Sequence, residues 1–151
     1  MLVMQYASKG DLHNYLQKDF TNITWNKQKL NMLWQISEGL ETIHGVNFIH
    51  RDFHSGNILF DNKIRNFSRR QYHQWKIGDL GLSQPANNVS SNNEIYGVIP
   101  YIAPEIFKGS AFSKESDVYS MGMIMWELTT GCKPFASVEH DIHLVYKILD
   151  G

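Results

Sequence analysis

Three clusters of polar residues in this sequence have types and positions that could support catalysis. They are Asp52 with Asn57, Asp79 between two nearby glycines, and an Ala-Pro-Glu run that ends at Glu105. Each cluster lies where an apolar segment gives way to a predicted loop, which is the usual position of catalytic groups. A loop aspartate can accept a proton during catalysis, although one taken alone is more often a turn residue or an ion-pair partner. The order and spacing of the clusters therefore carry more information than any one of them.

Two histidines beside the first cluster offer a different chemistry. His50 and His54 are four residues apart, so on a helix they would share a face and could bind a zinc ion together. Gly56 and the strand-like residues on both sides argue against a helix here. The alternative is that His50 is a packed core histidine whose ring nitrogens bond to backbone groups.

Read in order, the clusters resemble the signature of protein kinases, which is H-R-D-x-x-x-x-N, then D-F-G, then A-P-E. The sequence has His50-Arg-Asp-Phe-His-Ser-Gly-Asn57, then Asp79-Leu-Gly81, then Ala103-Pro-Glu105. Residues 2–12 resemble the last strand of the family's small lobe and its hinge, and residues 116–128 resemble its central buried helix. The resemblance covers the whole sequence but only part of the family's domain.

The resemblance implies an α+β fold of the protein-kinase type, in which a mostly α-helical large (C-terminal) lobe follows a hinge strand and the small lobe is absent. Residues 1–151 would form one partial kinase domain, from the hinge to the helix after the activation segment. The sequence contains no glycine-rich phosphate loop and no strand with the phosphate-binding lysine. It also lacks the arginine that normally pairs with the A-P-E glutamate, so we expect Glu105 to have no such partner.

The implied activity is ATP-dependent phosphoryl transfer to a hydroxyl of a protein substrate, with serine and threonine favoured over tyrosine. Such an enzyme mainly positions the hydroxyl and neutralises phosphate charge, because the transition state is loose. On the family's pattern Asp52 accepts the hydroxyl proton, while Asn57 and Asp79 supply oxygen ligands to Mg²⁺. For the chain alone we expect little or no transfer, because half of the ATP pocket is missing. The alternative is a catalytically silent, pseudokinase-like binding or regulatory module.

The resemblance also assigns residues to the nucleotide. Met4 would be the gatekeeper, and the backbone of Gln5 and Ala7 would pair with adenine. Asp11 would lie near the ribose, and Leu59 would form the floor beneath the adenine. These five assignments come from the alignment alone.

Three positions depart from the family's pattern. Leu80 replaces the usual Phe of D-F-G and should keep an apolar plug. His54 stands where serine/threonine kinases usually have Lys, so one phosphate-facing charge is missing or depends on pH. Val98 stands where a Thr normally bonds the catalytic aspartate, and valine cannot make that bond. We therefore expect lower efficiency, although the carboxylates are all present.

Arg51 suggests a means of regulation. In family members with Arg at this position, a phosphate that pairs with it often orders the activation loop. Glu94 stands three residues before Gly97, and we predict that it takes the place of the phosphorylated residue. The simpler alternative is that Glu94 is a solvated loop charge. Its modifiable neighbours are Ser90, Ser91 and Tyr96.

The helices that must position these groups can be predicted from the spacing of apolar residues. This spacing predicts a short helix over Leu12–Leu16 with Asp11 as its N-cap. It also predicts a longer helix that ends near Ile43, with Thr24 as its cap and Gly45 as its C-terminal stop. The apolar residues of the longer helix are Leu30, Leu33, Ile36, Leu40 and Ile43.

The remaining elements follow from the same reading. Two small strands, Val46–Ile49 and Asn57–Phe60, are expected around the loop, and Trp75–Ile77 should join the second of them through a long hairpin connection. Turn-forming residues predict a mobile loop over Ser83–Glu94. Further helices are expected from Ser116 to Leu128, buried on most sides, and from Asp141 to Leu149. The apolar residues predicted to share a face of the first are Val118, Met121, Met125 and Leu128.

Composition limits the class of protein. The 14 Lys+Arg against 15 Asp+Glu give a net charge of −1, which argues against duplex DNA or an anionic membrane as a partner. The single cysteine, Cys132, excludes an internal disulfide framework and a four-cysteine zinc site. No apolar run is long enough to span a bilayer, and the first residues do not resemble a signal peptide. We expect a cytoplasmic protein with no nucleic-acid or membrane partner, and its oligomeric state stays open.

Overall fold

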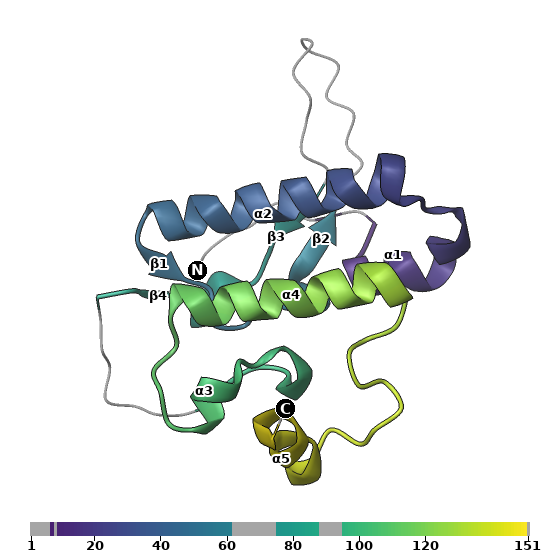
Figure 1. Ribbon diagram of the computed structural model, residues 1–151. Coiled ribbons are helices and arrows are strands. Elements are labelled where there is room, and N and C mark those ends of the chain that lie inside the picture. The colour runs from purple at the N-terminus through teal and green to yellow at the C-terminus, as the bar shows by residue number, and fades with distance from the viewer. Residues whose placement is uncertain (1–6, 8, 62–74, 88–94, 151) are drawn as a thin grey trace.

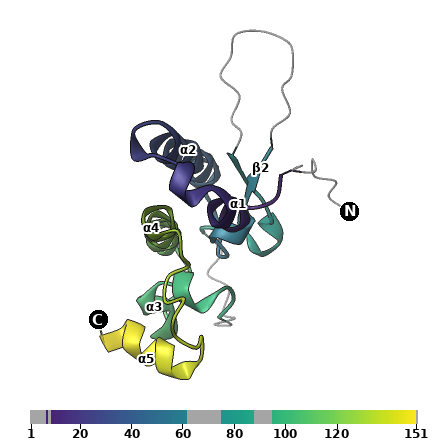
Figure 2. The same cartoon turned by 90° about the vertical axis from the view of Figure 1, so that its right-hand side faces the viewer.

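The computed structural model describes residues 7, 9–61, 75–87 and 95–150. In this part of the chain, helices lie beside two small antiparallel sheets (Figure 1). Helix α4 lies between α2 on one side and α3 with α5 on the other, as both views show (Figures 1 and 2). The helices are α1 (Leu12–Asp19), α2 (Leu30–Gly45), α3 (Pro104–Phe107), α4 (Lys114–Thr130) and α5 (Ile142–Asp150). The strands are β1 (Phe48–Ile49), β2 (Ile58–Phe60), β3 (Trp75–Ile77) and β4 (Gln84–Pro85).

Strand β2 forms the centre from which the site is built. It pairs antiparallel with β3, with Ile58 opposite Ile77, which confirms the predicted pairing of these two runs. On its other edge, the amide of Phe60 donates to the carbonyl of Gly10 at 2.9 Å. Residues 9–11 therefore run along β2 and lead directly into α1.

The other sheet differs from the prediction. Only Phe48–Ile49 of the predicted strand Val46–Ile49 is extended, and it pairs with β4, Gln84–Pro85. Strand β4 lies in the segment predicted as a mobile loop, whose residues 88–94 are outside the described part of the chain. Nothing in the sequence indicated this pairing, because strand pairing uses backbone groups. The backbone of Gln84 can pair in a sheet like that of any other non-proline residue, even within a segment rich in turn-forming residues.

The predicted ends of the first two helices are largely confirmed. Asp11 caps α1, since its side chain accepts from the amide of Asn14 at 2.8 Å. Thr24 occupies the N-cap of one π-helical turn, Trp25–Lys29, which continues into α2. Gly45 is still helical, and Asn47 with a φ of 61° is the residue that turns the chain. Asparagine tolerates this left-handed conformation better than most residues.

The predicted face of helix α4 is confirmed in part. Met121 and Leu128 are buried as predicted, whereas Val118 and Met125 are 59% and 42% exposed. The buried face also includes Ile124 and polar side chains that find partners inside the protein. These buried polar residues are Ser116, Asp117, Ser120 and Glu127. Periodicity counted from apolar residues alone does not detect such a face.

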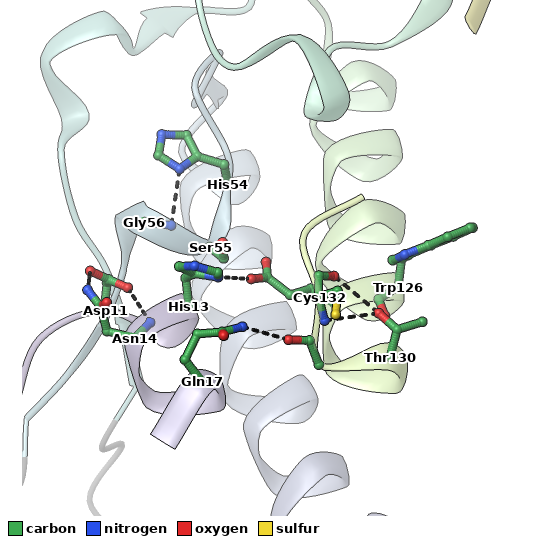
Figure 3. Close-up of polar contacts among 12 residues, drawn as sticks. Asp11, His13, Asn14, Gln17, His54, Ser55, Gly56, Trp126, Thr130 and Cys132 are labelled. Carbon is green, nitrogen blue, oxygen red and sulfur yellow. Dashed lines mark hydrogen bonds and ion pairs between the residues drawn. The ribbon is translucent and has the colours of Figure 1, made fainter. Parts of the chain in front are cut away.

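One main core joins α1, α2, β2, β3 and α4. Within it, the rings of Tyr15, Phe60 and Trp75 contact one another, with centroids 4.7–5.3 Å apart. A smaller cluster of Ile102, Ala103 and Ile106 lies around α3. The Gln17 side chain donates to the carbonyl of Gly131 at 2.8 Å, so α1 is also tied to the end of α4 (Figure 3). No helix in the described residues is both long enough and apolar enough to cross a membrane.

Candidate active site

The loop that carries Asp52 is held in place by hydrogen bonds to a buried carboxylate of α4. Asp117 is 1% exposed, and its two oxygens accept from the amides of His50 at 2.8 Å and Arg51 at 3.0 Å. A third contact comes from His44 Nε2 at 2.9 Å. Charge-assisted hydrogen bonds of this kind are strong when they are buried. They hold Arg51 at a φ of 73°, a conformation that a non-glycine residue seldom adopts.

His50 is a packed core residue, as the sequence suggested. Its ring is fully buried, and Nε2 contacts the carbonyl of Gly78 at 3.1 Å while Nδ1 accepts from the amide of Asp52 at 3.3 Å. Both ring nitrogens are therefore bonded to backbone, which leaves neither for a zinc ion. No group of three potential metal-binding His, Cys, Asp or Glu side chains occurs in residues 7, 9–61, 75–87 and 95–150.

Asp52 and Asn57 are brought together directly. The Asn57 side-chain nitrogen donates to the backbone carbonyl of Asp52 at 2.9 Å and lies 3.3 Å from its carboxylate oxygen Oδ2. Because the amide nitrogen of Asn57 is used in this way, its carbonyl oxygen is the atom left for a cation. Amide and carboxylate oxygens are the ligands that Mg²⁺ prefers.

The other carboxylate oxygen of Asp52, Oδ1, is buried and accepts no hydrogen bond in the structure. The threonine that would normally reach the aspartate is replaced by Val98, so this finding agrees with the sequence analysis. His54 Nε2 lies 3.5 Å from Oδ1. The His54 ring lowers the pKa of the Asp52 carboxyl below its ordinary value, and Asn57 adds to this effect, while burial acts in the opposite direction. Asp52 is therefore held as a carboxylate, the form that can accept a proton.

The orientation of His54 decides which of its nitrogens faces Asp52. The amide of Gly56 donates to Nδ1 at 3.1 Å (Figure 3), so Nε2 is the nitrogen that faces the carboxylate. The ring also lies beside Tyr101, with centroids 5.9 Å apart.

Asp79 follows a residue that is bonded to the rest of the site. The amide of Gly78 donates to the carbonyl of Asn57 at 2.8 Å, so Asp79 directly follows a residue bonded to Asn57, which ends a 3₁₀ turn just before β2. Its carboxylate is exposed, its φ is 51°, and its side chain accepts from Gly81 at 3.3 Å. Leu80 is 46% exposed, and the expectation of a buried apolar plug is wrong here. It lies on the outside of a tight turn, at an open groove of about 470 Å³ between α2 and β3.

The residues assigned to the nucleotide are only partly described. Asp11 forms a backbone bridge with Leu59, so these two are neighbours, and Ala7 is half-buried. Both carboxylate oxygens of Asp11 contact Asn14 (Figure 3), although a carboxylate has lone pairs for further donors. The other two assigned residues, Met4 and Gln5, lie outside the described residues.

The structure describes only one of the two glutamates singled out in the sequence, Glu105 and not Glu94. Glu94, with Ser90 and Ser91, lies outside the described residues. Glu105 is half-buried, and burial together with its nearby charge raises the pKa of Tyr119. Within the described residues no cation forms an ion pair with Glu105.

Sequence reasoning missed a polar chain beside the site. The carboxylate of Glu127 is fully buried and contacts His13 Nδ1 and the hydroxyl of Tyr101. The same hydroxyl lies 3.1 Å from Ser55 Oγ in the loop that carries Asp52. Charged residues are almost never fully buried unless they are paired. An Asp and a Glu within the predicted buried helix were therefore the signal that could have located Asp117 and Glu127.

Comparison with known proteins gives one consistent result. A family model of the protein kinase domain matches residues 1–150. The chain is 38% identical to the dual specificity protein kinase splA of Dictyostelium discoideum over 88% of the chain, and 31% identical to the serine/threonine/tyrosine-protein kinase HT1 of Arabidopsis thaliana over 89%. It is 29% identical to mitogen-activated protein kinase kinase kinase 7 of Drosophila melanogaster over 99%. It spans 6%, 32% and 21% of the length of these three relatives, respectively.

Proposed function

Because this chain belongs to the protein kinase family, we propose that it carries the catalytic loop and the metal-binding residues of an ATP-dependent protein phosphotransferase. The observation that supports this most directly is the Asn57 amide bound to Asp52, with Gly78 bonded to the same asparagine just ahead of Asp79. The Asp52 carboxylate, which can accept a proton, is thus linked through backbone contacts to two residues with oxygens that can bind a metal ion, Asn57 and Asp79. This is the set of groups that phosphoryl transfer needs.

In this proposal each polar group has a separate task. Asp52, which is ionised at neutral pH, orients the substrate hydroxyl and accepts its proton. The Asn57 carbonyl and the Asp79 carboxylate would hold Mg²⁺. The ion, when bound with ATP, supplies positive charge that neutralises the phosphate oxygens. Asp11 and Leu59 would border the ATP ribose and base, together with Met4, Gln5 and Ala7 of the hinge.

We assign residues 1–151 to the hinge and the large lobe of the domain, up to the helix after the activation segment. The helices packed around α4 and the run of residues 9–11 along β2 support this assignment. The acceptor would be a protein hydroxyl, with serine and threonine favoured. A cytoplasmic location without a nucleic-acid or membrane partner agrees with the near-neutral charge.

The second candidate is a catalytically silent module, which one observation favours. The buried Asp52 Oδ1 accepts no hydrogen bond, with His54 Nε2 at 3.5 Å and no hydroxyl at Val98, so part of the carboxylate's expected support is absent. A silent module would bind nucleotide or protein partners through the same lobe but transfer no phosphate.

The test compares Asp52→Asn with the unchanged sequence in the longest natural protein that contains this chain. Phosphate transfer from labelled ATP to a protein acceptor should fall about 10²–10⁴-fold. Asp19→Asn, at the exposed end of α1, is the matched control and should leave the rate unchanged. Equal rates for Asp52→Asn and the unchanged protein would contradict the catalytic role. No transfer by either, with ATP binding retained, would support the silent module.

A further inference from the structure

The side chain of Arg51 carries a charge that is almost completely buried. Arg51 is 8% exposed, and burial lowers the pKa of its guanidinium. Among the residues that the structure describes, no carboxylate forms an ion pair with it. A buried charge without compensation is costly, so the groups that do surround this guanidinium must stabilise it.

Those groups include two aromatic rings. The guanidinium carbon of Arg51 lies 5.0 Å from the ring centroid of Phe112 and 5.5 Å from that of Tyr96. Both distances are within the range in which a cation is attracted to the face of a ring, and the attraction grows when the pair is desolvated. The burial of Arg51 therefore strengthens the contacts that hold it.

The two rings come from opposite ends of one segment. Tyr96 immediately precedes Gly97, which faces Asp52, and Phe112 immediately precedes Ser113, the N-cap of α4. Phe112 also packs on the small cluster around α3. A single arginine in the catalytic loop thus touches the beginning and the end of residues 96–112.

We propose that Tyr96 and Phe112 form an aromatic clamp on Arg51 that ties residues 96–112 to the catalytic loop. The two rings are positioning residues, because they act on Asp52 only through the adjoining Arg51 and through Gly97. The clamp is inferred from the distances between the guanidinium and the two rings. Its consequence for phosphate transfer rests on the proposed function.

The residues of the clamp also border one small cavity, which is lined by Arg51, Asp52, Gly97 and Phe112 among others. The aromatic contacts are separate from the sequence prediction for Arg51, in which Glu94 supplies the negative charge, because Glu94 lies outside the described residues.

The decisive experiment is a double-mutant cycle on the whole 151-residue chain, in which urea unfolding measures the stability of each variant. Arg51→Met removes the cation, Phe112→Leu removes a ring but keeps apolar volume, and the double variant measures their coupling. We expect the coupling to correspond to about a 2- to 30-fold change in the unfolding equilibrium. Additive effects of the two substitutions would overturn the proposal, because they would mean that Phe112 contributes packing alone.

Amide hydrogen exchange supplies a second measurement that needs no activity. Tyr96→Leu should speed exchange of residues 97–103 by a similar factor, whereas Tyr96→Phe keeps the ring and should leave it unchanged. Phe135→Leu is the matched control, since Phe135 stacks on Trp126 at 6.4 Å, away from the clamp. Faster exchange in Glu94→Gln with none in Tyr96→Leu would overturn the clamp and support the carboxylate.

The clamp and the proposed function can fail separately. Coupling between Arg51 and Phe112 in a protein that transfers no phosphate would support the clamp and contradict the catalytic role. Transfer that is lost in Asp52→Asn, in a protein without the coupling, would support the catalytic role and overturn the clamp.

Discussion

His13 Nδ1 lies 2.5 Å from Glu127 Oε1, and the carboxylate that this ring reaches is completely buried (Figure 3). The other oxygen of Glu127 accepts from the hydroxyl of Tyr101 at 2.8 Å, and that hydroxyl is 3.1 Å from Ser55 Oγ. One polar chain therefore connects α1, α4, the segment before α3 and the catalytic loop. Each member depends on the others, because a buried polar group left without a partner is costly.

Removing the central carboxylate should strongly destabilise the chain. We expect Glu127→Ala to lower the free energy of unfolding by about 3–5 kcal/mol, because it leaves Tyr101 and His13 without their partner. Glu127→Gln keeps the volume and an acceptor for Tyr101, and should cost only about 1 kcal/mol. Urea unfolding checks both values, with Glu139→Ala at an exposed site as the control. Equal losses for the alanine and glutamine variants would contradict the prediction.

Alkaline pH should destabilise the fold through Tyr101. Burial and the Glu127 carboxylate raise the pKa of Tyr101, so the folded chain keeps this proton where the unfolded chain has lost it. The stabilisation is complete below the unfolded pKa of about 10 and decreases above it. The decrease is up to about 1.4 kcal/mol per pH unit.

The measurement is the free energy of unfolding at pH 9 and pH 11. Tyr101→Phe should show a smaller decrease between these values than the unchanged chain, since one linked proton is gone. Tyr146→Phe, at a residue that is 58% exposed, should decrease as much as the unchanged chain does. If all three decreased equally, the linkage to Tyr101 would be wrong.

Two glycines should respond in opposite ways to the same substitution. Gly97 has a φ of 109°, and a Cβ there would lie 3.2 Å from Asp52 Oδ1, so Gly97→Ala should cost about 1–3 kcal/mol. Gly122 lies in α4 with nothing within 4 Å of an added Cβ. Gly122→Ala should therefore stabilise the chain by about 0.5–1 kcal/mol. Thermal unfolding of both variants decides the matter, and a shift of the same sign in both would refute the argument.

A hydroxyl beside Asp52 should restore a missing hydrogen bond. Val98 and Asp52 line the same small cavity, and the buried Asp52 Oδ1 has no donor. We expect Val98→Thr to stabilise the chain by about 1 kcal/mol and to lower the pKa of Asp52 further, which a carbon-13 NMR titration would detect. Val118→Thr on the exposed side of α4 is the control and should change neither quantity. An unchanged pKa in Val98→Thr would show that the hydroxyl does not reach the carboxylate.

Local relationships in the site could be predicted from the sequence. Asp52 and Asn57 are five residues apart in one loop, and their hydrogen bond follows from that short separation. The cap of α1 by Asp11 and the pairing of β2 with β3 are also nearby contacts. In each case the residue types and the turn between them leave few alternatives.

Contacts between distant segments could not be predicted in this way. Asp117 is 66 residues from Arg51, and Phe112 approaches the same arginine from yet another element. Their meeting depends on how α4 is rotated about its axis, which buried polar partners determine as much as apolar residues do. The predicted face of α4 is only partly correct for this reason, since Val118 points to solvent while Asp117 is buried, although Met121 and Leu128 are buried as predicted.

Gly78 makes this site sensitive to substitution at a residue that has no side chain. Its carbonyl meets His50, its amide bonds to Asn57, and a Cβ would lie 2.7 Å from the Leu59 side chain. Both ends of the His50–Asn57 motif and the Leu59 side chain thus converge on a residue that supplies no side-chain atom to the chemistry. In a saturation mutagenesis screen we expect position 78 to tolerate almost no substitution, and so to score among the catalytic residues while having no catalytic group.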